Sequence, residues 1–441
     1  MVGGGGVSGT GGHIGGARKT DRRPIVSGHG FGAALHRWPI AILIFVLAVL
    51  RVGVLGRTLS ASFNPVDFSM YYCAGLTLRH GENPYRTEMA PLAKRLGLEK
   101  GYTVQTNDPP SFLLAFEPLT LLSPHQAYWA WQAVSAAAFA ASLFLLLWPG
   151  YSGLGGPMAL ALAGFAILFP PVGNNFVIAQ SKMLVLLPLV AMMRFMERKR
   201  DGLAGLMLAV AVLLRVFPLL LGGYLVLTRR WRVLGYTIAA TLAGAIVTMA
   251  IMGVGTSLSF FTAVGSLSSE RWLSTTSNIS LMAFVSRIVW SLFGSAPGPL
   301  VEFVRRASVI SVDLVVMYLV VRATLSAGRD DREWRVFSLW IVASVMLSPT
   351  AWFHYLLLML IPFVQMACAA NRGAVRSRTL WMAVGCYLAI GLTSDVLRLL
   401  SQHPQLIEKF REAESVSLLI AFVAVYWFAV DLPDRPLSTK A

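Results

Sequence analysis

Asp67 is the one carboxylate in an otherwise aromatic and apolar stretch near the start of the chain, DFSMYYCAGLTLRHG at residues 67 to 81. The spacing of its apolar residues and a preceding proline predict a helix that starts near residue 66. Ionised carboxylates accept hydrogen bonds and protons, and the positive end of a helix dipole favours the ionised form. A carboxylate at a helix start is most often structural, so a chemical role for Asp67 requires other polar residues nearby.

Polar residues suited to such a role recur between apolar segments further along the chain. Asp108 precedes a double proline in NDPPS, and the rigid turn would hold its side chain in place. The other candidates lie in PPVGNNFVIAQSK, VLLRVFP, STTSNISLMAFVSR and SPTAWFHYLLL, and they include Asn175, Gln180, Lys182, Arg215, Asn278, Arg287, Trp352, His354 and Tyr355. Taken singly, a tryptophan, tyrosine or histidine at the edge of an apolar segment is ordinary for a membrane interface.

The elements that must position these residues are membrane-spanning helices. Of the 441 residues, 56% are apolar and only 13% are charged, which no single soluble core requires. Apolar runs close to the 20 residues that cross a bilayer occur at 38–56, 126–148, 232–253, 300–324, 350–370, 380–397 and 415–431. Because alternating strand patterns are absent, the sequence predicts an all-α, polytopic membrane protein.

Basic residues predict which ends of the helices face the cytoplasm. They cluster at residues 18–23, 197–201, 229–232, 329–335 and 372–378, and the positive-inside rule assigns these stretches to the cytoplasm. Three polar-rich stretches then lie on the outer face, at residues 57–110, 254–299 and 348–355. We expect the helix carrying Asp67 to be amphipathic and to lie at the outer membrane surface.

Two regions depart from simple crossings. Only 26 residues separate the basic loops at 201 and 229, too few for two full crossings. We therefore expect a hairpin of two short helices broken at Pro218, with Arg215 near its tip, where a buried cation needs an anionic partner. The four apolar segments between 111 and 196 must cross an odd number of times, so one is expected to be re-entrant, and the sequence does not say which.

Several functions are disfavoured by composition. The net charge of +16 comes from the short loops between apolar segments, which argues for membrane topology and against nucleic-acid binding. The three cysteines lie far apart and form no metal or disulfide pattern. No Asp-x-Asp motif for a divalent cation occurs, although Asp67 and Asp108 could share one. We expect no cofactor and no metal, and turnover that survives EDTA.

Five stretches, in order along the chain, resemble the polyprenyl-phosphate-sugar-dependent glycosyltransferases of the membrane GT-C class. They are DFSMYYCAGLTLRHGENPY, NDPPSFLLAFEPLTLLSP, GNNFVIAQSKMLVLLPL, GLAGLMLAVAVLLRVFPLLL and SPTAWFHYLLLMLIP. The resemblance is greatest to glycosyltransferase family 87, which includes mycobacterial mannosyl- and arabinofuranosyltransferases, and it covers roughly residues 38–400. Arg215 stands where the family often has lysine, and Asp108 replaces a tyrosine. The second departure leaves open whether Asp108 joins the chemistry or caps a turn.

The resemblance implies transfer of a sugar from a polyprenyl-phosphate donor to a hydroxyl of a glycan or glycolipid, with inversion, at the outer leaflet. It implies that Asp67 accepts the acceptor proton and that His354 and Arg215, with Lys182 and Arg287 as further candidates, hold the phosphate. The other residues expected to bind substrate are Tyr71, Asn83, Tyr85, Asp108, Asn175, Gln180, Asn278, Trp352 and Tyr355. Membrane lipids are the remaining expected partners.

We expect one catalytic domain of GT-C type, with about 11–13 apolar helical segments, over residues 38–432, and cytoplasmic tails at 1–37 and 433–441. Its outer loop at 57–110 would carry juxtamembrane helices, and the protein would lie in the plasma membrane. The alternative is a lipid or small-molecule transporter, but transporters typically have repeated halves and sites near the midplane. No repeat is evident here, and a non-catalytic scaffold would not need so many polar residues on one face.

Overall fold

The computed structural model describes residues 38–61, 66–98, 106–148, 152–266, 269–293, 298–326, 333–400, 410 and 412–430. Within these ranges the regular elements are helices, and the only pairing of strand type is an isolated bridge between Asn278 and Trp352. The predicted all-α, polytopic architecture is confirmed. The expected tails, 1–37 and 433–441, lie outside the described residues.

Six helical segments among the described residues are long and apolar enough to cross a membrane. They are α2 (Trp38–Ala61), α6 (Pro124–Leu147), α13 (Trp231–Met252), α17 (Pro299–Ser326), η4 with α19 (Phe353–Met359 and Leu360–Asn371) and α22 (Ala413–Val430). A seventh candidate is the pair α8 (Gly156–Leu168) and α9 (Pro170–Val177), which is bent by 49°. Prolines at 170 and 171 account for the break, because proline cannot continue a helix's hydrogen bonds. This pair is either a broken span or the expected re-entrant segment.

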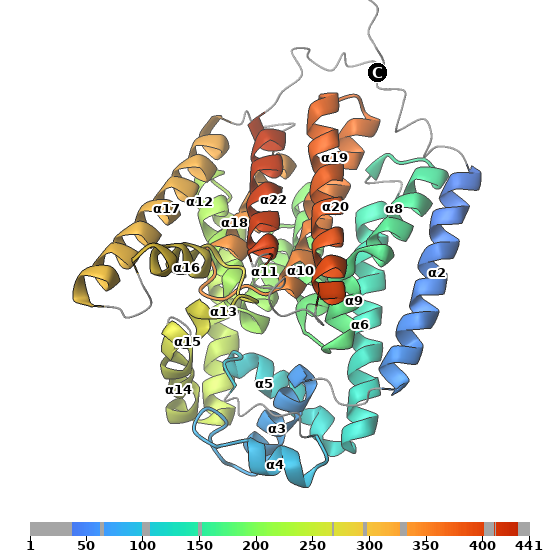
Figure 1. Cartoon of the computed structure of the whole chain (residues 1–441). Coiled ribbons are helices and arrows are strands. Elements are labelled where there is room, and N and C mark those ends of the chain that lie inside the picture. Colours follow the sequence, from blue (N-terminus) through green and yellow to red (C-terminus); the bar gives the residue numbers. More distant parts are fainter. Residues whose placement is uncertain are drawn as a thin grey trace, which may run out of the picture.

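Further elements connect and surround these spans, and the last of them, with 24 residues, is as long as α2. They are α3 (Val66–Arg79), α4 (Ala90–Arg95), α5 (Pro110–Phe116), η1 (Glu117–Leu121), α10 (Lys182–Glu197), α11 (Asp201–Leu214), η2 (Phe217–Leu220), α12 (Leu221–Leu227), α14 (Val254–Gly265), α15 (Glu270–Ser274), α16 (Leu281–Phe293), α18 (Glu333–Met346) and α20 (Ser377–Leu400). Figure 1 shows α3, α4 and α5 together at one end of the bundle.

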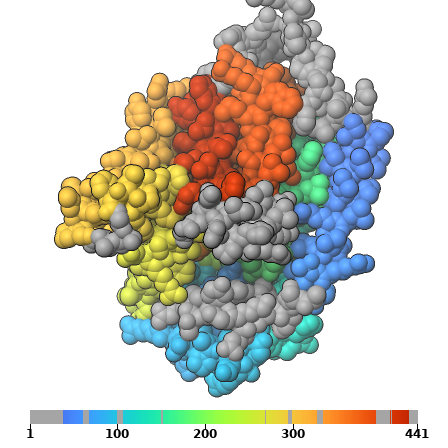
Figure 2. Space-filling view, viewed as in Figure 1, coloured from blue at the N-terminus to red at the C-terminus, as the bar shows by residue number. Residues whose placement is uncertain are grey.

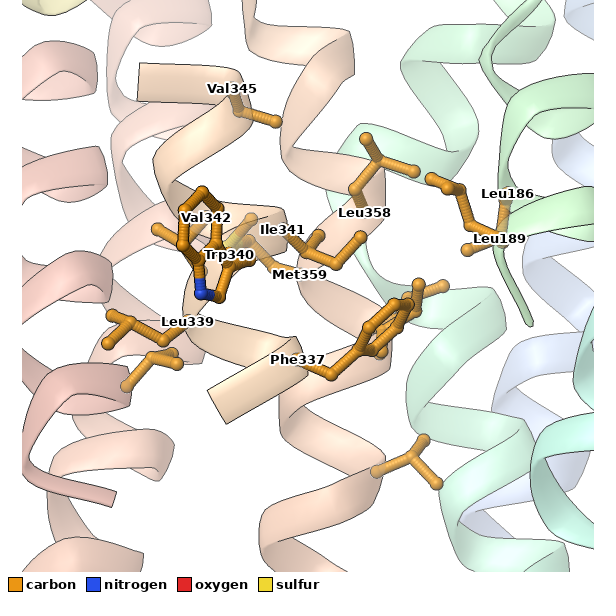
Figure 3. Packing of buried hydrophobic residues seen from close by; sticks show 14 of the residues in the cluster. Leu186, Leu189, Phe337, Leu339, Trp340, Ile341, Val342, Val345, Leu358 and Met359 are labelled. Carbon is orange, nitrogen blue, oxygen red and sulfur yellow. The ribbon is translucent and has the colours of Figure 1, made fainter. Parts of the chain in front are cut away.

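The core lies around α18, which is buried continuously from Arg335 to Met346. Phe337 and Trp340 of α18 lie in one apolar cluster with Leu189 of α10 and Leu358 of η4 (Figure 3). A helix that is apolar on every side is stable only when other helices surround it. By contrast, α2 and α13 expose most of their large apolar side chains, as helices that face lipid do.

Four of the basic loops gather at one end of the bundle. Arg230 forms an ion pair with Glu333 at 2.6 Å. Glu197 interacts electrostatically with Arg372 and also with Glu333. These contacts join loops that the positive-inside pattern assigns to one membrane side, and they lie opposite to α3, α4 and α5 (Figure 1).

The region between residues 201 and 229 is the predicted hairpin of two short helices. α11 ends at Leu214, and the chain breaks at Arg215 before η2, whose first turn contains Pro218. The return through η2 and α12 ends at Leu227, beside the start of α13. Arg215 therefore lies at the tip, as expected.

The helix carrying Asp67 forms where predicted, but most of its side chains are buried inside the protein. Phe68, Tyr71, Tyr72 and Ala74 of α3 are at most 4% exposed. Packing against η1, α5, α4 and α6 covers the faces that the sequence pattern left for solvent and lipid. The expectation of an amphipathic helix with exposed faces was wrong, because neighbouring elements distant in sequence enclose it, whereas its place at the outer membrane surface stays a prediction. Figure 2 shows the cyan segment around α4 forming this end of the molecule.

Gly205 allows α11 and α13 to approach closely, and its replacement by alanine is expected to destabilise the protein by about 1–3 kcal/mol. A Cβ atom at Gly205 would lie 2.6 Å from the carbonyl oxygen of Val233, a backbone atom that cannot move alone. The apparent unfolding temperature in detergent should therefore fall. Gly235→Ala on α13 is the matched control, because no atom of the described residues lies within 4 Å of its Cβ position. Equal effects of the two substitutions would contradict this reading of the interface.

Candidate active site

A cavity of about 1280 Å³ opens among α3, α11, α13, α14 and η4. Most of its wall is apolar. Its charged and polar lining includes Asp67, Asp108, Gln180, Lys182, Arg215 and His354. All of them come from loops, helix breaks or helix starts, where backbone and side chains can face a cavity inside a helical membrane protein.

Asp67 lies in the first turn of α3, and its Oδ2 accepts a hydrogen bond of 2.7 Å from Nε2 of Gln180. Burial raises the pKa of Asp67 to about 6, although Gln180 and the charges of Lys182 and Arg215 partly oppose the shift. Loss of hydration therefore outweighs the helix dipole, which by itself would lower this pKa. A carboxylate with a pKa near neutrality is suited to exchange a proton at physiological pH.

Gln180 connects Asp67 to the basic side chains. Its Oε1 accepts from the hydroxyl of Tyr71 at 3.0 Å and from Nζ of Lys182 at 3.1 Å. Lys182 is 1% exposed, and its ammonium lies 4.2 Å from the ring centroid of Tyr355. A buried ammonium can donate three hydrogen bonds, and the hydrogen bond to Gln180 is the one found for Lys182 among the described residues.

A tight turn after α9 positions Gln180, Ser181 and Lys182. Ala179 has a φ of 56°, in the left-handed region that glycine usually occupies at the end of a helix. The turn closes with a 2.8 Å hydrogen bond from the backbone N–H of Gln180 to the carbonyl of Asn175. Nε1 of Trp131 donates to the carbonyl of Ala179 at 2.9 Å. These contacts support a strained backbone next to the cavity.

Arg215 has the anionic partner that its burial requires. Its Nη1 forms an ion pair with Asp108, whose side chain is 1% exposed. Its Nε and Nη2 donate to Oγ of Ser181 at 2.9 and 2.8 Å, and Nη2 also donates to the hydroxyl of Tyr71 at 2.8 Å. Asp108 thus pairs with Arg215, a role that the sequence did not indicate, and its part in the chemistry stays a prediction. Ser181 was not predicted, because nothing in its local sequence indicates a partner 34 residues away.

Asn83 and Tyr85 support Asp108 from behind the cavity and do not line it. The hydroxyl of Tyr85 donates to the carbonyl oxygen of Asp108 at 2.7 Å. Oδ1 of Asn83 accepts from the backbone N–H of Tyr85 at 3.0 Å, and its Nδ2 donates to Ser259 at 3.0 Å. These contacts fix the backbone at Asp108, whose side chain forms the ion pair with Arg215.

His354 lies in η4 and is 5% exposed, so it does not belong to an interfacial belt. Its Nε2 is buried without a hydrogen-bond partner among the described residues, although His354 lines the cavity. Nδ2 of Asn175 donates to the carbonyl of His354 at 2.9 Å and fixes the backbone of η4. A buried ring nitrogen without a partner is costly unless a ligand completes its hydrogen bonding.

Trp352 lines the cavity, whereas Asn278 and Arg287 lie beside it. Oδ1 of Asn278 accepts from the backbone N–H of Ala351 at 3.1 Å. Arg287 pairs with Glu412, with N–O distances of 2.6 and 2.7 Å. The structure thus brings Asp67, Lys182, Arg215 and His354 to one cavity, but not Arg287. Among the described residues, no three His, Cys, Asp or Glu side chains gather to hold a metal ion.

The profile of glycosyltransferase family 87 matches residues 108–349, more than half of the chain. The chain belongs to glycosyltransferase family 87. This family 87 chain is also similar to a curated protein of Mycobacterium tuberculosis (strain CDC 1551 / Oshkosh), the polyprenol-phosphate-mannose-dependent alpha-(1-2)-phosphatidylinositol pentamannoside mannosyltransferase. The two are 27% identical over 317 residues, which is 70% of this chain and 68% of the relative. The expected resemblance is confirmed, and the protein is a multi-pass membrane glycosyltransferase.

Proposed function

We propose that the protein transfers a sugar from a polyprenyl-phosphate donor to a hydroxyl group of a glycan or glycolipid, with inversion at the anomeric carbon. The observation that supports this proposal best is the shared cavity, in which the carboxylate of Asp67 accompanies Lys182, Arg215 and His354. The donor named for the mycobacterial relative makes mannose the first sugar to test.

In the proposed reaction Asp67 acts as the general base. The acceptor oxygen forms a bond to the anomeric carbon while its proton moves to the Asp67 carboxylate. The bond between the anomeric carbon and the phosphate oxygen breaks at the same time, and polyprenyl phosphate leaves with an additional negative charge. Gln180 orients the carboxylate through its 2.7 Å hydrogen bond.

Lys182 and His354 are the groups best placed to stabilise the departing phosphate. The guanidinium of Arg215 is already engaged by Asp108, Ser181 and Tyr71, so it contributes charge and holds the turn that carries Lys182. Lys182 has unused donor capacity, and His354 offers a buried ring nitrogen. Donors fixed in a water-poor site stabilise charge that develops in the transition state without reorganisation.

The apolar wall of the cavity suits the polyprenyl chain. Ala245 and Met249 of α13 and Leu258, Phe261 and Val264 of α14 contribute to it. Phe261 and Leu258 are 67% and 52% exposed, so this wall continues onto the lipid-facing surface. A lipid tail can therefore leave the cavity into the bilayer while its head group stays inside.

We also propose that the cavity faces the outer side of the plasma membrane and that α2 starts in the cytoplasm. The four clustered basic loops lie at the opposite end from α3, which carries Asp67. Trp38, the first residue of α2, lies beside Gly156 near that basic end. The positive-inside rule places such loops in the cytoplasm. Thiol labelling of a single cysteine introduced at the exposed Glu82 would test the orientation.

Transfer of radiolabel from polyprenyl-phosphate mannose to a lipid-linked mannoside, by purified protein in nanodiscs, tests the function. A glycosylated product is expected, and addition of EDTA should not lower its rate. A transporter would move the donor between leaflets and give no product. A panel of polyprenyl-phosphate sugars identifies the donor if mannose is not accepted, and no transfer from any of them would overturn the proposal.

The rate of transfer should depend on pH through Asp67. Burial raises the pKa of Asp67 from 3.8 to about 6, and a general base works only when ionised. We therefore expect kcat/KM to be half-maximal near pH 6 and to fall about tenfold for each further unit of acidification. Initial rates in nanodiscs between pH 4.5 and 8 would measure this, and a rate that stays constant down to pH 4.5 would contradict a raised pKa for Asp67 in the working enzyme.

A further inference from the structure

The cavity contains a second group of polar and aromatic residues that the proposed reaction does not use. Trp272, Ser277, Trp352 and Glu414 all line it. They belong to three segments distant in sequence, namely α15 with the loop that follows it, the approach to η4, and the first turn of α22. Trp272 and Trp352 are both partly exposed, with ring centroids 5.9 Å apart and ring planes at 83°.

Arg287 of α16 connects two of these segments. Its Nη1 donates to the carbonyls of Leu273, Thr275 and Asn278, at 3.2, 3.0 and 2.9 Å. Its Nε and Nη2 form the ion pair with Glu412, two residues before Glu414. Arg287 therefore fixes the start of α22 against the loop that carries Ser277.

Asn278 connects the third segment to the same loop. Its backbone bridges to Trp352, and its Oδ1 accepts from the N–H of Ala351 at 3.1 Å. Its Nδ2 donates to the carbonyl of Trp272 at 3.2 Å. The relative positions of the two tryptophans are thus set by buried hydrogen bonds, as a preformed binding surface requires.

Glu414 differs from its neighbour Glu412 in one important respect. Glu412 is neutralised by Arg287, whereas no described residue forms an ion pair or hydrogen bond with Glu414. Both carboxylates are near the start of α22, where the helix dipole favours negative charge, but only Glu414 faces the cavity. An unpaired carboxylate on a cavity wall is available to accept hydrogen bonds from a ligand.

We propose that Trp272, Trp352 and Glu414 form a subsite for a carbohydrate ring of the acceptor. Sugar rings present C–H groups that pack on aromatic faces and hydroxyl groups that donate to carboxylates, which matches this combination. Ser277 supplies a further hydroxyl at the exposed side of the wall. Arg287 and Asn278 act as positioning residues.

The subsite is assigned to the acceptor because the other walls suit the parts of the donor. Lys182 and His354 match the phosphate, and the α13 and α14 wall matches the polyprenyl chain. The tryptophans and Glu414 offer neither an additional cation nor a long apolar surface. This inference rests on the proposed function, since it assumes that a sugar-containing acceptor enters the cavity.

Steady-state kinetics of the full chain in nanodiscs test the assignment, with polyprenyl-phosphate mannose as donor and octyl α-mannoside as acceptor. Glu414→Gln and Trp352→Ala should each raise the KM for the acceptor about tenfold and leave the KM for the donor unchanged, as expected for the loss of one hydrogen bond to a charged group or one stacking contact. Trp352→Phe keeps an aromatic face and should raise the KM for the acceptor less than Trp352→Ala does. Trp148→Ala and Glu82→Gln, exposed residues outside the cavity, are the matched controls.

A binding measurement separates failure of this subsite from failure of the proposed function. The measurement is saturation-transfer NMR on the Asp67→Asn protein, because it detects binding without turnover. The probes are methyl α-mannopyranoside, methyl α-mannobioside and methyl arabinofuranoside. Saccharide binding that is weakened about tenfold by Glu414→Gln supports the subsite even if no transfer is observed. Any of three results would overturn the inference. None of the probes binds, or neither Glu414→Gln nor Trp352→Ala affects binding, or the variants raise the KM for the donor instead of the KM for the acceptor.

Discussion

Replacement of Asp67 by asparagine is expected to lower kcat for sugar transfer by about 10²- to 10⁴-fold, the usual contribution of a positioned general base. Asparagine keeps the size of the side chain and can still bond to Gln180, but it cannot accept the proton of the attacking hydroxyl. The KM for the donor should change little, because Lys182 and His354 remain. Radiolabel transfer under single-turnover conditions would measure the chemical step directly.

The same substitution should not weaken the fold. Burial raises the pKa of Asp67 above 3.8, so the folded state favours the protonated form, and the ionised form present at pH 7 costs stability. A neutral side chain removes that cost, and the unfolding temperature at pH 7 should be equal or higher. Asp201→Asn, at the opposite basic end, is the control for removal of a carboxylate. Activity of Asp67→Asn within tenfold of the original protein would eliminate the base assignment.

The membrane helices could be predicted from sequence because their signal is local. The apolar run at 232–253 differs from α13 by one residue at each end, and the run at 300–324 lies within α17. The break at Arg215 was also predictable, since Pro218 and the short distance between basic loops both indicate it. In each case a bilayer requirement acts on consecutive residues, so no knowledge of distant contacts is needed.

The pairing inside the site could not be predicted, because it joins residues more than 100 positions apart. Asp108 and Arg215 were each predicted to belong to the site, but the residues around each of them do not indicate that the two form an ion pair. Gln180 was expected to bind substrate, which stays a prediction, and the structure adds a hydrogen bond to Asp67, 113 positions away. Arg287 was expected at the phosphate, but Glu412, a residue with no local motif, pairs with it outside the cavity.

Burial was the other property that local sequence did not reveal. The pattern of α3 predicts one apolar face, yet η1, α4 and α5 also cover much of the remainder. That enclosure raises the pKa of Asp67, whereas a surface helix would have left it low. The feature most relevant to catalysis thus depends on tertiary packing, which acts on the carboxylate through loss of hydration.

Loss of one partner of the Asp108 and Arg215 ion pair should be the most destabilising change in the site. Asp108→Asn leaves a buried guanidinium unpaired, and Arg215→Met leaves a carboxylate that is 1% exposed without its cation. Each is expected to cost about 3–5 kcal/mol. Because membrane proteins often unfold irreversibly, the measurement is the apparent unfolding temperature in detergent at a fixed scan rate.

The double substitution Asp108→Asn with Arg215→Met should recover most of the lost stability, because neither charge of this pair is then left without its partner. It should not recover transfer, since Ser181 and Tyr71 lose the guanidinium that fixes the turn before Lys182. Arg306→Gln is the control, because its side chain is 70% exposed and its ion pair with Glu302 should contribute no more than about 1 kcal/mol. If the double variant were as unstable as the sum of the single variants, the two residues would not be energetically coupled. If it were stable and fully active, Arg215 would have no part in positioning the basic side chains of the site.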